Sequence, residues 1–130
     1  MSTEWGESQI GDIVVETAIR LHRELGPGLL ESVYEITLSR LLAKRGLAVQ
    51  RQYPVPIYFD GERLEEGFRA DILIEGKVIL ELKSVEQLTR LHHKQLLTYL
   101  KLSGLKLGYL LNFGEELMKS GISRVVNGQL

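Results

Sequence analysis

Two carboxylates and a lysine near the middle of the sequence are spaced so that neighbouring strands could bring them together around a metal ion. Asp71 lies in one apolar run, and Glu81 and Lys83 lie in the next run, beyond a turn at 75–77. Carboxylates on neighbouring strands can bind one hard divalent cation, with the Leu82 carbonyl as a third oxygen ligand. Magnesium suits such a site because it keeps several waters and needs few protein oxygens. Lys83 can then reach a metal-bound water or a scissile phosphate, so the pattern favours phosphodiester chemistry.

The turn selects the register of this hairpin. With Glu75-Gly76-Lys77 as the loop, Ile74 faces Val78 and Asp71 lies opposite Glu81. Because side chains alternate along a strand, one face is wholly apolar and should be the core. That face carries Ala70, Ile72, Ile74, Val78, Leu80 and Leu82, whereas the other carries Arg69, Asp71, Leu73, Ile79, Glu81 and Lys83. The simpler alternative is a surface strand pair whose Glu–Lys ion pair contributes about 0–1 kcal/mol.

A later amphipathic segment carries a second polar group. His92, Gln95 and Tyr99 are spaced by three and four residues, which places them on one helical face. Gln95 and Tyr99 offer uncharged hydrogen bonds suited to phosphate oxygens or to a neighbouring lysine. The alternative is a helix that buries its leucines and leaves these polar groups at the boundary of the core.

The third group begins just after the first turn of the chain. Gly28 precedes Glu31 and Tyr34, which share a face of a second predicted helix. A glutamate in the first helical turn is favoured by the helix dipole, so helix initiation is the alternative to a functional role.

Hydrophobic spacing and turn residues predict the elements that must position these groups. Gly26-Pro27-Gly28 separates two helices, and Pro54 and Pro56 are expected to bend or interrupt the first strand. We expect helices at 8–25, 29–45 and 85–103, and strands at 47–52 with 57–59, 66–74, 77–83, 107–113 and 122–126. This order predicts one α/β domain of the α+β type over 1–130, with a mixed sheet.

The bulk composition is that of an ordinary globular protein. The chain is 44% hydrophobic and 25% charged, and its net charge of −1 provides no overall basic field. It contains no cysteine, its first residues do not resemble a signal peptide, and no apolar run could span a bilayer. We therefore expect a cytoplasmic protein without membrane contact. Nucleic-acid binding would depend on a local basic cluster, for which the candidates are Arg51, Arg63, Arg69, Lys83, Arg90 and Lys94.

Taken together, the three groups resemble a known superfamily. A helical glutamate, a strand aspartate, a strand Glu-x-Lys and a helical Gln-x-x-x-Tyr follow one another as in the PD-(D/E)XK nuclease superfamily. More narrowly, the chain resembles the GxxExxY proteins from about residue 10 to residue 126. The matching segments are Gly28-x-x-Glu31-x-x-Tyr34, Arg69-Ala-Asp71, Glu81-Leu-Lys83, His92-x-x-Gln95-Leu-Leu-x-Tyr99-Leu and Leu107-Gly-Tyr-Leu-Leu-Asn-Phe-Gly114. Ala70 stands where the superfamily name has proline, a position that touches no ligand.

The resemblance implies a restriction-endonuclease-like core, with a central mixed β-sheet flanked by helices, and a magnesium-dependent phosphodiesterase site in which manganese can substitute. Asp71 and Glu81 would be metal ligands, Glu31 would approach the metal from its helix, and Lys83 would position or activate water. Gln95 and Tyr99 would orient Lys83 or the phosphate. Arg69, His92 and Tyr34 are expected to contact the substrate.

The expected substrate is nucleic acid, with DNA favoured over RNA. The superfamily also contains members that bind without cutting, so a non-catalytic nucleic-acid- or protein-binding module is the alternative. A symmetric homodimer and a partner protein that delivers the substrate are further expectations.

Overall fold

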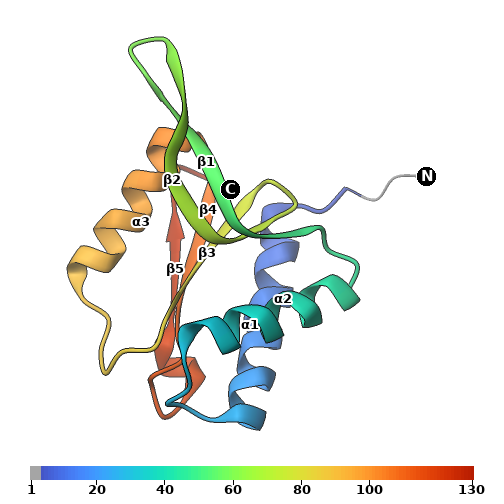
Figure 1. Ribbon diagram of the computed structural model, residues 1–130. Helices are drawn as coiled ribbons and strands as arrows, with labels where there is room; N and C mark the ends of the chain where they lie inside the picture. Colours follow the sequence, from blue (N-terminus) through green and yellow to red (C-terminus); the bar gives the residue numbers. More distant parts are fainter. Residues whose placement is uncertain (1–3) are drawn as a thin grey trace.

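A five-stranded mixed sheet forms the middle layer of the computed structural model, which describes residues 4–130. Helices α1 and α2 cover one face of the sheet and α3 covers the other (Figure 1). The strand order is β1-β2-β3-β4-β5, and only the β3–β4 pair is parallel. The elements are α1 Glu7–Leu25, α2 Glu31–Lys44, β1 Val49–Phe59, β2 Glu62–Ile74, β3 Val78–Lys83, α3 Arg90–Ser103, β4 Leu107–Asn112, the 3₁₀ helix η1 Met118–Gly121 and β5 Ile122–Val126. The predicted α+β fold, a mixed sheet flanked by helices, is confirmed.

The register predicted for the β2–β3 hairpin is also confirmed. Ile74 pairs with Val78 and Ile72 pairs with Leu80, so the loop consists of three residues. Glu75 and Gly76 in this loop have φ values of 53° and 65°, a conformation that glycine adopts easily. The Lys77 N–H closes the loop by donating to the Ile74 carbonyl oxygen (2.9 Å).

Both faces of the sheet are packed, whereas the sequence predicted a core on one face. Ile72, Ile74, Val78, Leu80 and Leu82 pack in the cluster formed with α1 and α2, as expected. On the opposite face, Leu73 and Ile79 are buried beneath Leu96 and Leu100 of α3. Ala70 belongs to this second cluster rather than to the first. Asp71 and Glu81, the acidic pair, therefore lie at the margin of a packed interface and not on an open surface.

The first strand was predicted to bend or break at 53–56; the break is wrong, and an irregularity in the register is present there. Strand β1 continues through both prolines, with one register shift between Val55 and Ile57. Proline is tolerated there because β1 is an edge strand, where a missing N–H need not break a ladder. Beyond Val55, β1 and β2 continue as a two-stranded arm that projects from the body (Figure 1).

The start of α3 also differs from the prediction, because the helix begins at Arg90 rather than at 85. Thr89 caps it, since its hydroxyl accepts from the His92 N–H (3.4 Å) while His92 Nδ1 accepts from the Thr89 N–H (3.1 Å). The preceding loop is held by Asn112, whose side chain bonds the Val85 N–H (3.0 Å) and the Val85 carbonyl oxygen (2.9 Å).

Candidate functional site

The two central carboxylates lie where the β2–β3 ladder ends. The last residues paired in that ladder are Ile72 and Leu80, and the same register places Asp71 across from Glu81. Past this point the Leu82 N–H donates to Asp71 Oδ2 (2.8 Å) instead of continuing the ladder. Because the N–H and C=O of a strand residue point to the same side, the Leu82 carbonyl is directed toward the same region. The sequence and the register therefore bring Asp71, Glu81 and the Leu82 backbone together.

Glu81 carries a strongly perturbed carboxyl group. Burial raises its pKa to about 9, and the charge of Asp71 and a hydrogen bond with Asp71 act in the same direction. The positive charge of Lys83 lowers this pKa, and Glu35 raises it slightly further. Glu81 Oε1 is buried and has no hydrogen-bond partner among the described residues. In the absence of a cation, Glu81 is therefore protonated at neutral pH.

The donor set fits a divalent cation that needs few protein ligands. Glu81 Oε1 has no partner among the described residues and lies beside the Asp71 carboxylate. A divalent cation bound here would replace the proton on Glu81 and neutralise the repulsion between the two carboxylates. Residues 4–130 bring together no group of three or more histidine, aspartate or glutamate side chains suited to a metal. Two carboxylates and one backbone carbonyl match an ion that keeps most of its waters, and they match an all-protein cage poorly.

Lys83 lies beside the pair on the same face of β3. It follows Glu81 by two residues, and its charge is close enough to act on the Glu81 carboxyl. Its backbone is fixed by the parallel ladder with β4, where it pairs with Asn112, and its carbonyl accepts from the Phe113 N–H (2.8 Å). The half-buried lysine is thus held at the edge of the site.

Helix α2 approaches the pair through two glutamates. The exposed Glu31 lies in the first helical turn, and its Oε2 accepts from the Ser84 N–H (3.3 Å), directly after Lys83 in the chain. Glu35, one turn later, is buried and binds Arg51 (2.8 Å) and Gln52 Nε2 (2.7 Å). Gln52 Nε2 also reaches Asp71 Oδ1 (3.4 Å), so it links Glu35 to the pair.

Sequence reasoning missed Glu35 and Gln52 as parts of this site. The four-residue spacing from Glu31 could have identified Glu35, because both lie on one helical face. No local signal identifies Gln52. It has φ 48°, unusual for a residue other than glycine, at the point where β1 passes the acidic pair.

On the other side of the pair, α3 contributes Tyr99. Its ring stacks on Phe68 with a centroid distance of 4.0 Å. Burial raises the pKa of the Tyr99 hydroxyl, and the charges of Glu81 and Asp71 raise it further, which places the hydroxyl in their field. Gln95 is exposed one turn earlier on the same helix and makes no side-chain hydrogen bond within residues 4–130. Arg69 is exposed on β2 next to Phe68.

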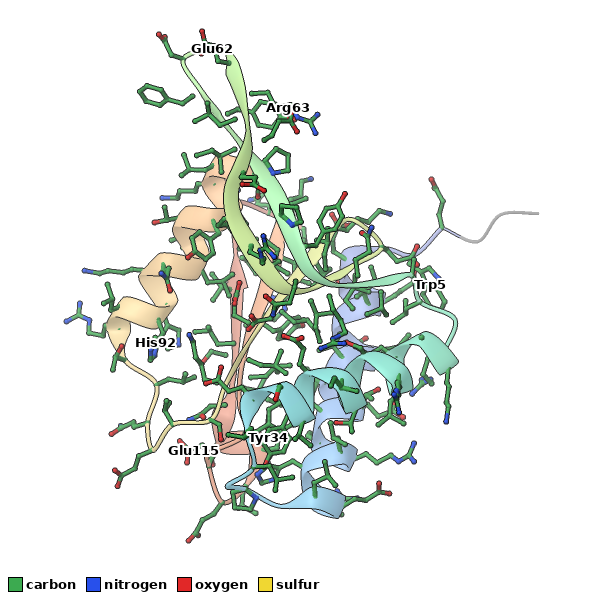
Figure 2. All side chains as sticks on the ribbon, in the orientation of Figure 1. Trp5, Tyr34, Glu62, Arg63, His92 and Glu115 are labelled. Atoms are coloured by element: carbon green, nitrogen blue, oxygen red, sulfur yellow. The ribbon has the colours of Figure 1, made fainter. Side chains whose placement is uncertain are left out.

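His92 and Tyr34 occupy structural positions. His92 lies at the start of α3 and bonds the Thr89 backbone (Figure 2). Tyr34 is fully buried, stacks on Phe113 at 4.3 Å and donates its hydroxyl to the Gly26 carbonyl oxygen (2.5 Å). The same hydroxyl accepts from the Leu29 N–H (3.1 Å). Tyr34 therefore holds the turn that presents Glu31, and it does not offer its hydroxyl to a substrate.

The fold and the acidic pair define a nuclease-like α+β protein, and a comparison with protein families agrees. A family model of the PD-(D/E)XK nuclease superfamily matches residues 8–125. The chain belongs to this superfamily, which suggests nuclease activity and a divalent metal. No curated protein and no solved structure matches the chain. None of the helices within residues 4–130 is long and apolar enough to cross a membrane.

Proposed function

We propose that the chain is a metal-dependent nuclease that hydrolyses phosphodiester bonds, with DNA as the favoured substrate. The supporting observation is the partnerless Glu81 Oε1, which lies beside Asp71 at the open end of a strand ladder. Asp71, Glu81 and the Leu82 carbonyl would hold Mg²⁺, and Mn²⁺ can substitute. We also propose the narrower placement among the GxxExxY proteins, on the motif at Gly28, Glu31 and Tyr34.

A bound divalent cation would lower the pKa of water and stabilise the negative charge that develops on the phosphate. Lys83 would orient the attacking water and stabilise the same charge, since its side chain lies on the face of β3 that carries Glu81. From α3, Tyr99 and Gln95 would bind phosphate oxygens of the substrate. Arg69 would bind the nucleic-acid backbone farther from the cleavage site. Glu31 would bind the cation through water, because its carboxylate is already bonded to the Ser84 N–H.

A non-catalytic binding module on the same fold is the second candidate. It keeps the same fold and the same donor set, and the superfamily also contains members that bind without cutting. A protein delivering the substrate fits either candidate, given the net charge of −1.

The two candidates are separated by incubating purified protein with plasmid and with single-stranded DNA, in Mg²⁺, in Mn²⁺ and in EDTA. We expect cleavage with either cation and none in EDTA. Asp71→Ala and Lys83→Ala should each reduce the rate by about 100-fold or more, whereas Lys119→Ala, an exposed control on η1, should match the wild type.

Cleavage that survives EDTA, or that persists in both variants, would refute the proposed nuclease site. Binding without turnover, little affected by Lys83→Ala, would support the binding module. Calorimetry with Mn²⁺ tests the metal site separately. Asp71→Ala should abolish the heat of Mn²⁺ binding whether or not the protein cleaves nucleic acid.

A further inference from the structure

The arm formed by the ends of β1 and β2 has no packing partner within residues 4–130. In this arm, residues 56–67, the pairs run Ile57–Leu64, Tyr58–Arg63 and Phe59–Glu62. The side chains of Phe59, Tyr58 and Leu64 are 71%, 51% and 45% exposed. A two-stranded ribbon alone is marginally stable in water, so an arm with exposed apolar residues indicates an interaction surface.

The charge of the arm narrows the choice of partner. Asp60, Glu62, Glu65 and Glu66 stand against Arg63 alone, a net charge of −3 (one minus four). Glu62 and Arg63 lie near its tip (Figure 2). Because opposed residues on paired strands point to one side, Ile57, Phe59 and Leu64 share a face. An acidic arm with an apolar face would be repelled by nucleic acid and needs a cationic, partly apolar partner surface.

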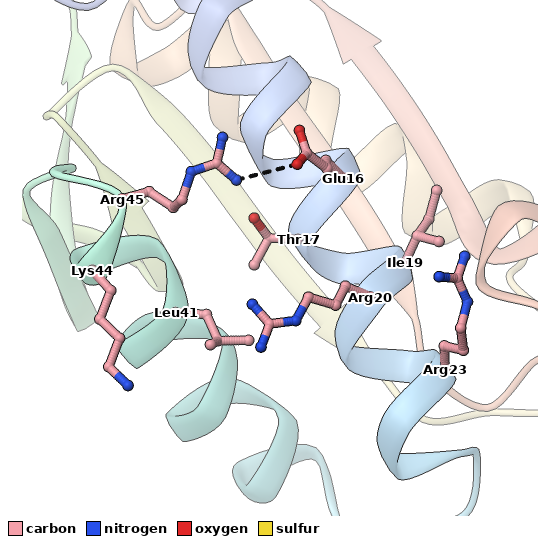
Figure 3. Close-up of a pocket in the computed structure, with 8 residues that line it drawn as sticks. All are labelled: Glu16, Thr17, Ile19, Arg20, Arg23, Leu41, Lys44 and Arg45. Atoms are coloured by element: carbon pink, nitrogen blue, oxygen red, sulfur yellow. Dashed lines mark hydrogen bonds and ion pairs between the residues drawn. The ribbon is translucent and has the colours of Figure 1, made fainter.

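The chain itself carries such a surface. A groove of about 510 Å³ lies between α1 and α2 (Figure 3), and no residue of the acidic site lines it. Ile19 and Leu41 contribute apolar surface, and the cationic lining consists of Arg20, Arg23, Lys44 and Arg45. Glu16 also lines the groove and pairs with Arg45 (3.4 Å).

The groove keeps an excess of positive charge. Four cations against Glu16 give +3 (four minus one), the opposite of the arm. Arg20 is paired with Glu24 (3.5 Å), but Arg23 and Lys44 form no ion pair within residues 4–130. These two cations are therefore available to an acidic partner.

We propose that the arm of one copy docks into the α1–α2 groove of a second copy. Phe59 and Leu64 would lie against Ile19 and Leu41, while the arm carboxylates would pair with Arg23 and Lys44. The arm projects away from the α1–α2 layer, so it cannot fill the groove of its own chain (Figure 1). Two antiparallel copies would exchange arms about a two-fold axis, which makes two identical contacts and closes the assembly. The proposal is independent of the nuclease assignment, because no groove or arm residue belongs to the acidic site.

Charge reversal tests the pairing directly. The arm variant is Glu62→Lys/Glu66→Lys, which leaves the Arg63–Glu65 ion pair intact. The groove variant is Arg23→Glu/Lys44→Glu, which leaves the Arg20 and Arg45 ion pairs intact. All four side chains are exposed, so both variants should fold, as circular dichroism would verify. Lys106→Glu/Arg124→Glu, also exposed, is the matched control.

Sedimentation equilibrium should show a dimer for the wild type and for the control. Each reversal variant alone should raise the dissociation constant by at least about tenfold, and Phe59→Ser should do the same. An equimolar mixture of the two variants should restore a dimer, because each arm then meets a groove of opposite charge. Raising the salt from about 0.05 M to about 0.5 M should weaken the wild-type dimer through screening.

A wild-type chain that stays monomeric would overturn the proposal. So would a dimer that tolerates both reversals, or a mixture of variants that fails to associate. If the groove variant binds an oligonucleotide more weakly while its self-association is unchanged, the groove binds polyanions and the proposal is likewise wrong.

Discussion

Glu81 combines two unfavourable conditions, since its carboxyl group is enclosed and lies beside Asp71. The folded pKa of about 9 exceeds the ordinary value of 4.5 mainly because burial disfavours the charged form. Between these values the folded chain binds more protons than the unfolded chain. The stabilising contribution of the protonated group is therefore complete below about pH 4.5 and is lost as the pH rises through about 9.

We expect Glu81→Gln to remove this dependence in metal-free protein. Glutamine keeps the shape of the side chain and carries no charge, so near pH 8 the variant should be more stable by about 1–3 kcal/mol. Urea unfolding in EDTA from about pH 5 to about pH 9 measures this. Glu86→Gln, an exposed control, should keep the wild-type profile. If the unfolding free energy of Glu81→Gln depended on pH in the same way as that of the wild type, the raised pKa of Glu81 would be contradicted.

At the residue scale, strand alternation was enough to predict that Asp71 and Glu81 face each other. The loop 75–77 allowed only one register that kept the apolar residues together. The link from Glu35 through Gln52 to Asp71 was beyond prediction, because it depends on how α2 crosses β1 and on the positive φ of Gln52. Tyr34 was predicted to contact the substrate. Only the tertiary packing shows that its ring stacks on Phe113 instead.

At the scale of elements, the segment from β3 to α3 decides how Lys83 and Tyr99 are placed relative to each other. Asn112 is fully buried and holds this segment through Val85, and its Oδ1 also accepts from the Gly114 N–H (3.1 Å). Its removal would leave buried backbone groups without partners.

Asn112→Ala should therefore lower the free energy of unfolding by about 3 kcal/mol and reduce nuclease activity in the remaining folded protein. Urea unfolding and the plasmid assay measure the two effects. Asn127→Ala is the matched control, because Asn127 Nδ2 bonds the Leu100 and Leu105 carbonyl oxygens at the far end of α3. It should lower stability and leave activity unchanged. Equal activity in the two variants would show that the loop does not position the site.

Element boundaries were predicted well where local chemistry decides them and poorly where the tertiary fold does. Gly104, with φ 78°, ends α3 as predicted, and β5 has the predicted bounds. Pro54 and Pro56 predicted a bend or a break in the first strand. The sequence does not show that β1 lies at the edge of the sheet, where proline is tolerated. The start of α3 was predicted too early because the apolar spacing continues into a loop that Asn112 holds.

For the whole molecule, a net charge of −1 conceals a separation of charge. Helix α3 carries Arg90, Lys94 and Lys101 and no acidic residue, and all three cations are exposed. This helix packs on the sheet face that bears Glu81, so its exposed cations lie on the same side of the sheet as the acidic pair. A polyanion can therefore be attracted to this side of a nearly neutral protein.

The combined variant Arg90→Ala/Lys94→Ala/Lys101→Ala tests whether α3 binds the phosphate backbone. If it does, affinity for a labelled oligonucleotide in EDTA should fall by about tenfold or more, and the salt slope should decrease by about one for each phosphate that the variant no longer binds. The reduction should be similar for unrelated sequences, because phosphate contacts carry no sequence information. Fluorescence anisotropy across a salt series measures both quantities, with Lys119→Ala as the control. An unchanged salt slope would mean that the phosphate backbone is not bound by these three cations of α3.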